Sequence, residues 1–354
     1  MKYQRADIEK RSDRDQVISG LDLSGIDLKG ANLAGAVFDR VNLDNADFSG
    51  ADLREVVFLE CGLDGVRFDC ARLPDATVHA CKLNGISAVE VDFCDATFTE
   101  CVINQAVFRK SNLTEAVFTH SSVFDTMFCE SRIYFTTFLE TQIKAPDFSK
   151  TFLERIVLVN VDLRGAVFSE SSIYLGALTG CDLSGLDLSG LDLSCTQFSQ
   201  SVLSDIKMAG AKLTQCNFNE ANLTGADLRG SNLDFAIFSR ANVERAQFGT
   251  SRMRHGVFVD ASVKGAVFDD VDAFQSQWEG ADCEGSSFRN AELSYADFSH
   301  ANLERCDFSG ASLFRANFHR VRAEDARIPG RAVALGDDAV RHRAESWTKH
   351  GANR

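Results

Sequence analysis

One regularity constrains the folding of this chain more than any other feature. Every fifth residue from Ile18 to Ile328 is apolar, and the pattern contains no insertion or deletion over its 63 positions. Neither the 3.6-residue period of an α-helix nor the two-residue alternation of a strand can keep every fifth side chain inside. A coil that turns by the same angle every five residues can do so. The sequence therefore predicts a solenoid in place of the two or three globular domains that 354 residues would otherwise suggest.

Two further columns accompany these apolar centres. The residue two places before a centre is usually small, as at Ala31, Ala36 and Cys61, and 19 of the 25 glycines stand two places after one. Small side chains let the walls approach, and glycine tolerates the positive φ that a type II turn requires. Leu and Phe often alternate at successive centres, and 22 of the 28 Phe are centres. We therefore expect four faces, with Phe stacked along one diagonal and Leu along the other.

The segment Ala221–Gly230 reads A-N-L-T-G-A-D-L-R-G, and by such segments the chain resembles the pentapeptide-repeat family, whose repeat is A-(D/N)-L-x-x. The resemblance implies an all-β solenoid, a right-handed quadrilateral β-helix with four pentapeptides per 20-residue coil. Residues 17–328 would form about sixteen coils, roughly 75 Å long at about 4.8 Å per coil. Residues 1–16 would be an N-terminal lead-in or cap, and residues 329–354 a C-terminal helical cap or tail.

The C-terminal segment is expected to contain a short helix that begins at Asp337 or Asp338. Val340, Ala344 and Trp347 would form its apolar stripe and cover the last coil. In some members of the resembled family a C-terminal element joins two copies. Val340 and Trp347 are therefore also candidates for the contact of a homodimer.

Charge and composition exclude several classes of function. The formal net charge is −14, which argues against general binding of nucleic acid, and against an anionic membrane surface as partner. The longest apolar runs are only a few residues, and the first 16 residues are too charged for a secretory signal. The odd number of cysteines, eleven, fits reduced thiols, so a cytoplasmic location is expected.

No motif for catalysis, phosphate binding or metal binding emerges from the sequence. We therefore expect a non-enzymatic protein with no cofactor and no metal site. Cys61, Cys81 and Cys101 are 20 residues apart and are predicted to form a buried column of small side chains rather than disulfides. His300 and His319 would lie close together, but no third ligand is evident, which favours surface histidines.

Aromatic residues at outward positions give the first candidate site. They occur on the face whose centres include Leu33, Leu53 and Leu313, and they either form a protein interface or pack along the wall. The first four members of the set are predicted to be the tightest group. The complete set is Tyr134, Phe135, Phe152, Tyr174, Phe235, Phe274, Tyr295 and Phe314.

Acidic residues near the N-terminus give a second candidate. Residues 17–100 contain 15 acidic and 6 basic residues, so about four coils carry a net charge of −9, whereas the whole predicted solenoid carries −17. This acidity either imitates DNA or simply reflects the Asp that often precedes a centre. The main contributors are Asp22, Asp27, Asp39, Asp44, Asp47, Asp52, Glu55, Glu60, Asp64 and Asp69.

These features lead to one principal functional hypothesis and two alternatives. The principal hypothesis is a protein-interaction scaffold or adaptor that binds an unidentified protein through its outer surface. The family resemblance implies the first alternative, a DNA mimic that regulates a DNA-binding enzyme such as DNA gyrase. Long pentapeptide-repeat chains that open with a Leu-Asp-Leu-Ser-Gly run, as this one does at Leu21–Gly25, also resemble accessory proteins of bacterial secretion systems, which is the second alternative. The same run recurs at Leu186–Gly190, which suggests an old duplication.

Overall fold

The computed structural model describes residues 3–12 and 16–351, and it describes side chains as far as Ser346. Contacts divide the chain into two compact units, and each is described by itself. Unit 1 comprises Met1–Leu186 and Leu191–Gln197, and unit 2 comprises Asp187–Gly190 and Phe198–Arg354. Among the helices of the described residues, none combines the length and the apolar character needed to cross a membrane.

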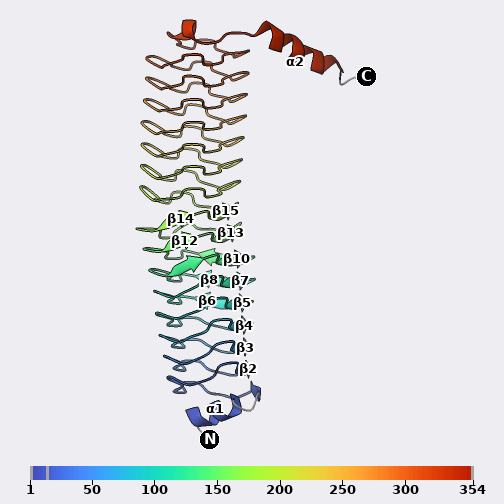
Figure 1. Cartoon of the computed structure of the whole chain (residues 1–354). Helices are drawn as coiled ribbons and strands as arrows, with labels where there is room; N and C mark the ends of the chain where they lie inside the picture. The colour runs from blue at the N-terminus through green and yellow to red at the C-terminus, as the bar shows by residue number, and fades with distance from the viewer. Residues whose placement is uncertain (1–2, 13–15, 352–354) are drawn as a thin grey trace. The chain divides into compact units, whose positions relative to one another are not determined.

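In its described residues, unit 1 contains one helix, α1 (Arg5–Ser12), and short strands that recur along the chain (Figure 1). The strands are β1 (Ile18–Ser19), β2 (Val37–Asp39), β3 (Val57–Leu59), β4 (Thr77–His79), β5 (Thr97–Thr99), β6 (Val102–Asn104), β7 (Val117–Thr119), β8 (Ser122–Phe124), β9 (Arg132–Tyr134), β10 (Thr137–Leu139), β11 (Gln142–Lys144), β12 (Phe152–Glu154), β13 (Val157–Val159), β14 (Ser172–Tyr174) and β15 (Ala177–Thr179).

All pairings between these strands are parallel, and partners are 20 residues apart, as Phe38 and Phe58 are. Nine strands form one sheet in the order β1-β2-β3-β4-β5-β7-β10-β13-β15. Two three-stranded sheets, β6-β8-β11 and β9-β12-β14, lie on other faces. Because hydrogen-bonded neighbours are always one coil apart, each sheet runs along the solenoid axis of the unit, with its strands across that axis.

Unit 2 continues the same 20-residue register through isolated parallel bridges. One column of bridges contains eight successive levels, from Asp187 to Arg327. The unit then forms a single 3-10 turn, η1 (Arg331–Val333), and ends in helix α2 (Ala339–Gly351). The predicted fold class, an all-β solenoid with a short C-terminal helix, is confirmed.

The sequence-based expectation was about sixteen coils in one rod, whereas the structure groups the coils into two compact units. The structure has two units, with nine strands in the long sheet of unit 1 and eight bridged levels in unit 2. The physical reason is that each coil of a solenoid contacts only its neighbours, so no single core joins distant coils into one compact body.

The predicted core is confirmed. Every apolar centre from Ile18 to Phe318 is buried, and only the last two centres, Ala323 and Ile328, are partly exposed. Phe centres one coil apart stack face to face, as Phe98 and Phe118 do at 4.7 Å between ring centroids. Phe centres from the opposite corner meet these stacks edge-on.

The column of small residues is also largely buried, and most of its polar members have partners. Thr126 Oγ1 donates a hydrogen bond to the carbonyl oxygen of Ile103 at 3.0 Å, and Thr136 Oγ1 donates to that of Leu113 at 2.7 Å. Cys61, Cys81 and Cys101 occupy this column as free buried thiols, as the sequence predicted. The bonded members therefore avoid the cost of an unsatisfied buried polar atom, whereas the buried Ser251 Oγ has no hydrogen-bond partner.

The backbone adopts positive φ at every fifth residue from Gly20 to Asp325, and 44 of these residues are not glycine. Such a conformation costs an ordinary L-residue roughly 1–2 kcal/mol, and it is least favourable for β-branched side chains. Thr250, at φ 61°, is a β-branched residue in this position, and the glycine of its repeat, Gly249, stands one place too early.

We expect Thr250→Gly to stabilise the protein by about 0.5–1 kcal/mol, because relief of the φ strain exceeds the entropy that glycine adds to the unfolded chain. The check is the midpoint of denaturant unfolding. Gly230→Ala provides the matched control at the same position one coil earlier, where φ is +65° and an added Cβ would lie 3.7 Å from Thr250 Oγ1, an ordinary contact distance. It should lower stability by a similar amount. A loss of stability in Thr250→Gly would contradict the strain argument.

Both ends of the chain contact their nearest coils. Ile8 of α1 is fully buried, and the Arg5 guanidinium donates to the carbonyl oxygens of Lys29 at 2.6 Å and Gly30 at 2.7 Å. At the other end, Leu335 pairs in parallel with Asn317. The segment before α2, rather than α2 itself, thus continues the hydrogen bonding of the last coil.

Candidate functional site: an exposed aromatic ladder

The predicted outward aromatic residues fall into two groups, one in each unit. In unit 2 the structure brings five rings together in an unbroken series, which we call the aromatic ladder. Its rings lie at outward positions of successive coils. The interior has no room for them because the apolar centres fill it. The ladder consists of Phe235, His255, Phe274, Tyr295 and Phe314.

The rings of the ladder contact one another but remain accessible. The centroid distances between successive rings are 4.8, 6.4, 5.6 and 5.6 Å. Phe235 is 51% exposed, Tyr295 43% and Phe314 51%. Packing against one another therefore leaves much of their apolar surface in water, which is the property expected of a binding surface.

A shallow cavity of about 410 Å³ lies along the last three rings of the ladder. Its lining combines the apolar rings with a few polar groups: Arg254, Phe274, Glu292, Ser294, Tyr295 and Phe314. Arg254 Nε donates to Asp272 Oδ2 at 2.6 Å, and the Arg315 guanidinium lies over the Tyr295 ring at 5.9 Å. The surroundings of the ladder thus carry charges of both signs.

His255, Arg254 and Arg315 belong to this surface but were absent from the sequence-based prediction. Their register relative to the apolar centres would have identified them, because each stands one or two places after a centre of the same face. A search restricted to Phe and Tyr passes over a stacked histidine. The Phe235 and His255 rings are nearly parallel, with 9° between their planes.

The aromatic residues of unit 1 are less closely associated than predicted. Tyr134 and Phe135 are in contact at 4.5 Å, and Arg155 covers Phe135 at 4.9 Å. Phe152 lies beside Arg132 in the next strand, and Tyr174 lies beside Glu154. No ring contact joins Phe152 or Tyr174 to the first pair within the described residues, so the tightest group lies in unit 2.

The acidic residues of the N-terminal coils do not gather on one face. Their positions in the five-residue register distribute them over all four faces, and several are paired with cations. Arg54 binds Asp52 with two hydrogen bonds and holds the pKa of that carboxyl below its usual value. Asp22, Asp27, Glu55 and Glu60 are the exposed members of the set.

The contacts of α2 differ from those predicted. Asp338 is the N-cap, as expected, because its Oδ1 accepts the backbone N–H groups of Val340 at 2.8 Å and Arg341 at 3.1 Å. Val340, however, is 71% exposed, and Ala344 is exposed as well, so this stripe does not cover the last coil. The side chain of Trp347 lies outside the described residues.

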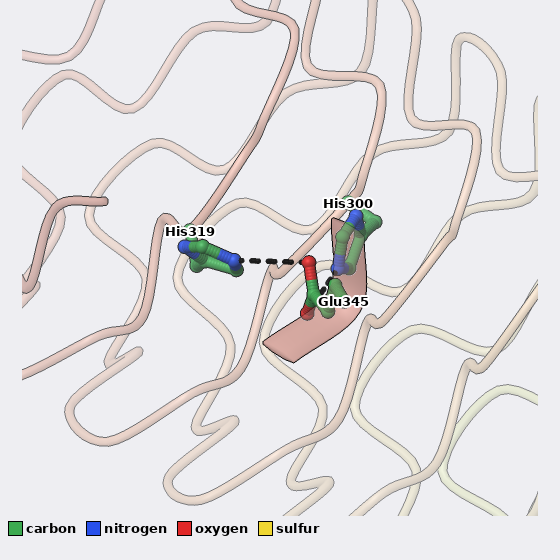
Figure 2. Close-up of side chains that lie close together, drawn as sticks. All are labelled: His300, His319 and Glu345. Carbon is green, nitrogen blue, oxygen red and sulfur yellow. Dashed lines mark hydrogen bonds and ion pairs between the residues drawn. The ribbon is translucent and has the colours of Figure 1, made fainter. Parts of the chain in front are cut away.

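A polar cluster attaches α2 to the wall of unit 2. Glu345 Oε1 is 3.1 Å from His300 Nε2, and Glu345 Oε2 is 3.4 Å from His319 Nε2 (Figure 2). Partial burial raises the pKa of Glu345, but hydrogen bonds from His300, Arg320, His319 and Arg341 outweigh this effect and lower it to about 2. These charged contacts explain why the helix turns its polar face to the wall.

Two of the outward cysteines, Cys94 and Cys129, are not activated. Cys94 is half-buried, and burial together with the neighbouring Asp95 carboxylate raises the pKa of its thiol to about 12. Burial likewise raises the pKa of Cys129. Both thiols are therefore protonated at neutral pH and are poor nucleophiles.

Comparison with known proteins identifies the repeat. The family model for pentapeptide repeats matches the chain in eight copies, and the matched residues are 22–58, 79–114, 92–123, 177–205, 206–245, 266–305 and 291–328. No curated protein matches the sequence.

Several solved structures match the chain over part of its length. HetL from the cyanobacterium Nostoc, a protein involved in heterocyst differentiation regulation, is 19% identical over 74% of this chain and 90% of its own, with a TM-score of 0.25. Full-length QnrB1, a plasmid-mediated fluoroquinolone resistance protein, is 19% identical over 56% of this chain and 98% of its own, with a TM-score of 0.25. A pentapeptide repeat protein from the Arabidopsis thaliana thylakoid lumen is 36% identical, but over only 25% of this chain and 66% of its own, with a TM-score of 0.15.

Proposed function

The chain belongs to the pentapeptide-repeat family, and we propose that it is a non-enzymatic scaffold that binds another protein through the aromatic ladder of unit 2. The observation that carries this proposal is the continuity of five contacting rings whose apolar surface remains accessible. Aromatic residues are enriched among the side chains that dominate binding energy at protein interfaces.

The spacing of the ladder favours a helical segment as the bound element. Successive rings stand on successive coils, so they repeat at about 4.8 Å along the wall. An α-helix presents an apolar residue about every 5.4 Å along its axis if each turn carries one, whereas one face of a strand repeats at about 6.6–6.8 Å. We therefore expect an amphipathic helix of the partner to lie along the ladder, with one apolar side chain near each ring.

The test compares the wild-type protein with the double variant Tyr295→Ser/Phe314→Ser as bait in extract of the source cell. We expect a protein that the wild type retains and the double variant loses, and its dissociation constant, measured afterwards with purified components, should rise at least about 30-fold. Because both side chains are exposed, unfolding stability should change by about 0.5 kcal/mol or less.

Two further variants make this test specific. Leu139→Ser changes an exposed apolar residue outside the ladder and should retain the partner. Phe152→Ser tests the aromatic residues of unit 1. If this variant loses the partner, the binding surface lies in unit 1 and not at the aromatic ladder. If the double variant binds every protein that the wild type binds, the ladder is not the interface.

The DNA-mimic alternative rests on a different observation, the net charge of −9 on residues 17–100. Variants of the acidic residues distinguish this alternative from binding through the aromatic ladder. Neutralising the exposed residues with Glu55→Gln and Glu60→Gln would weaken binding in a salt-dependent manner, and the purified protein would inhibit DNA supercoiling by gyrase. Retention of the partner by these variants would leave the aromatic ladder as the favoured surface.

A further inference from the structure

Three side chains with metal-binding atoms converge at the C-terminal end of unit 2. His300 and His319 lie on adjacent coils, with their ring centroids 5.5 Å apart, and Glu345 approaches them from α2 (Figure 2). One potential ligand atom from each residue lies within 4.8 Å of the other two. The wall of the solenoid fixes the two histidines, and the helix supplies the carboxylate.

We propose that His300, His319 and Glu345 bind a divalent transition-metal ion, of which Zn²⁺ fits best, and that the ion fastens α2 to the wall. Two imidazoles and one carboxylate are a common ligand set for zinc, with a water molecule in the fourth position. Tetrahedral bonds of about 2.0–2.1 Å place two ligand atoms roughly 3.3 Å apart. Glu345 Oε1 lies 3.1 Å from His300 Nε2 and Oε2 lies 3.4 Å from His319 Nε2, so each imidazole already has one carboxylate oxygen at about this separation.

Two arginines also bind Glu345, and they fit around a bound ion as outer partners. Arg341 Nε donates to Oε1 at 2.9 Å, and Arg320 Nη1 donates to Oε2 at 3.0 Å. Each carboxylate oxygen can accept more than one interaction, so it can keep its arginine while it faces the ion. The positive charge of Arg341 is partly balanced by Glu279, whose Oε1 lies 3.3 Å from Nη2.

His319 must exchange one hydrogen-bond partner when the ion binds. Its Nδ1 accepts the backbone N–H of Asp338 at 3.1 Å, so the neutral ring carries its proton on Nε2. A metal bond at Nε2 moves that proton to Nδ1, which then needs an acceptor. The Asp337 carboxylate, 3.8 Å from Nδ1, is in position to become that acceptor.

A simple histidine–carboxylate pair elsewhere on the wall shows what distinguishes this cluster. In unit 1, His120 Nδ1 lies 2.9 Å from Glu140 Oε2, and both side chains are exposed. That pair forms from two neighbouring coils alone. In the C-terminal cluster a second histidine is present, and His319 is only 1% exposed, so its ring is held in place rather than free in solvent.

The experiment titrates the full-length chain, without a histidine tag and under reducing conditions, first with Co²⁺ and then with Zn²⁺. We expect one equivalent of Co²⁺ to produce the visible absorption of a four- or five-coordinate site, and one equivalent of Zn²⁺ to displace it. A thiolate–cobalt band in the near ultraviolet should be absent, which separates this site from binding by exposed Cys70. His300→Ala and Glu345→Gln should each weaken binding at least about 10-fold.

His120→Ala provides the matched control, and its metal binding should equal that of the wild type. A second readout is tryptic cleavage after Arg341 and Arg343 in α2, which Zn²⁺ should slow in the wild type but not in Glu345→Gln. The proposal is overturned if the wild type shows no saturable binding of one equivalent. It is also overturned if His300→Ala, which leaves a folded chain by circular dichroism, binds the ion as well as the wild type.

Discussion

Replacing Phe118 by alanine should lower the free energy of unfolding by about 3–5 kcal/mol. Phe118 is fully buried, and its ring stacks at 4.7 Å on Phe98 in the coil before and at 4.7 Å on Phe138 in the coil after. Alanine would remove both stacking contacts and leave a cavity that these two rings cannot fill. The wall holds the coils in a fixed hydrogen-bonded register, so the backbone cannot collapse onto the gap.

Denaturant unfolding followed by circular dichroism measures this loss, and hydrogen exchange locates it. Because a solenoid is stabilised by contacts between neighbouring coils, exchange should increase most in β5, β7 and β10, next to the substitution. Phe152→Ala removes the same side chain from an exposed position of β12, 53% accessible, and should change stability by about 0.5 kcal/mol or less. A loss below about 1 kcal/mol in Phe118→Ala would contradict the stacked-core account.

The fold was predictable because one local rule repeats along the chain. Each apolar centre packs against the centres 20 residues before and after it. The burial of a side chain such as Leu223 can therefore be predicted from its position in the repeat, without knowledge of more distant segments. The ends do not obey this rule. Ala323 and Ile328 continue the sequence pattern, yet they are partly exposed because too little of the chain covers them.

For the candidate site, the position of a residue in the five-residue repeat predicts only whether its side chain points outward and on which face it lies. Register placed Phe235, Tyr295 and Phe314 on the outside of one face, and the structure agrees. It could not predict which outward rings touch, because this depends on the direction in which each side chain turns along the wall. The ladder uses the first outward position after the centre at Phe274 and the second at Tyr295, and the rings still meet at 5.6 Å.

The orientation of α2 was mispredicted for an electrostatic reason. An apolar stripe ordinarily faces the body of a protein, so Val340 was expected to be covered. The nearest wall presents His300, His319 and Arg320, which are all able to donate hydrogen bonds to a carboxylate. Glu345 satisfies these donors, and the helix therefore turns its charged side inward. A hydrophobic pattern contains no information about such partners on a distant coil.

We expect Ile8→Asp to detach α1 and to make the protein self-associate. Ile8 is fully buried between α1 and the first coil, and burial of a charged carboxylate there is unfavourable by several kcal/mol. When α1 leaves, the first coil loses the hydrogen bonds from Arg5 to Lys29 and Gly30, and that from the Asn32 N–H to Glu9. The exposed backbone groups of an end coil can then pair with the end of another molecule.

Light scattering at increasing protein concentration provides the measurement. The Ile8→Asp protein should form larger species as concentration rises, at concentrations where the wild type shows no such increase. Ala6→Asp introduces the same charge at an exposed position of the same helix and should behave as the wild type. If Ile8→Asp shows no greater association than Ala6→Asp, α1 does not protect the end of the solenoid. In that case water satisfies the unpaired backbone N–H and C=O groups of the first coil, and the protein stays soluble without α1.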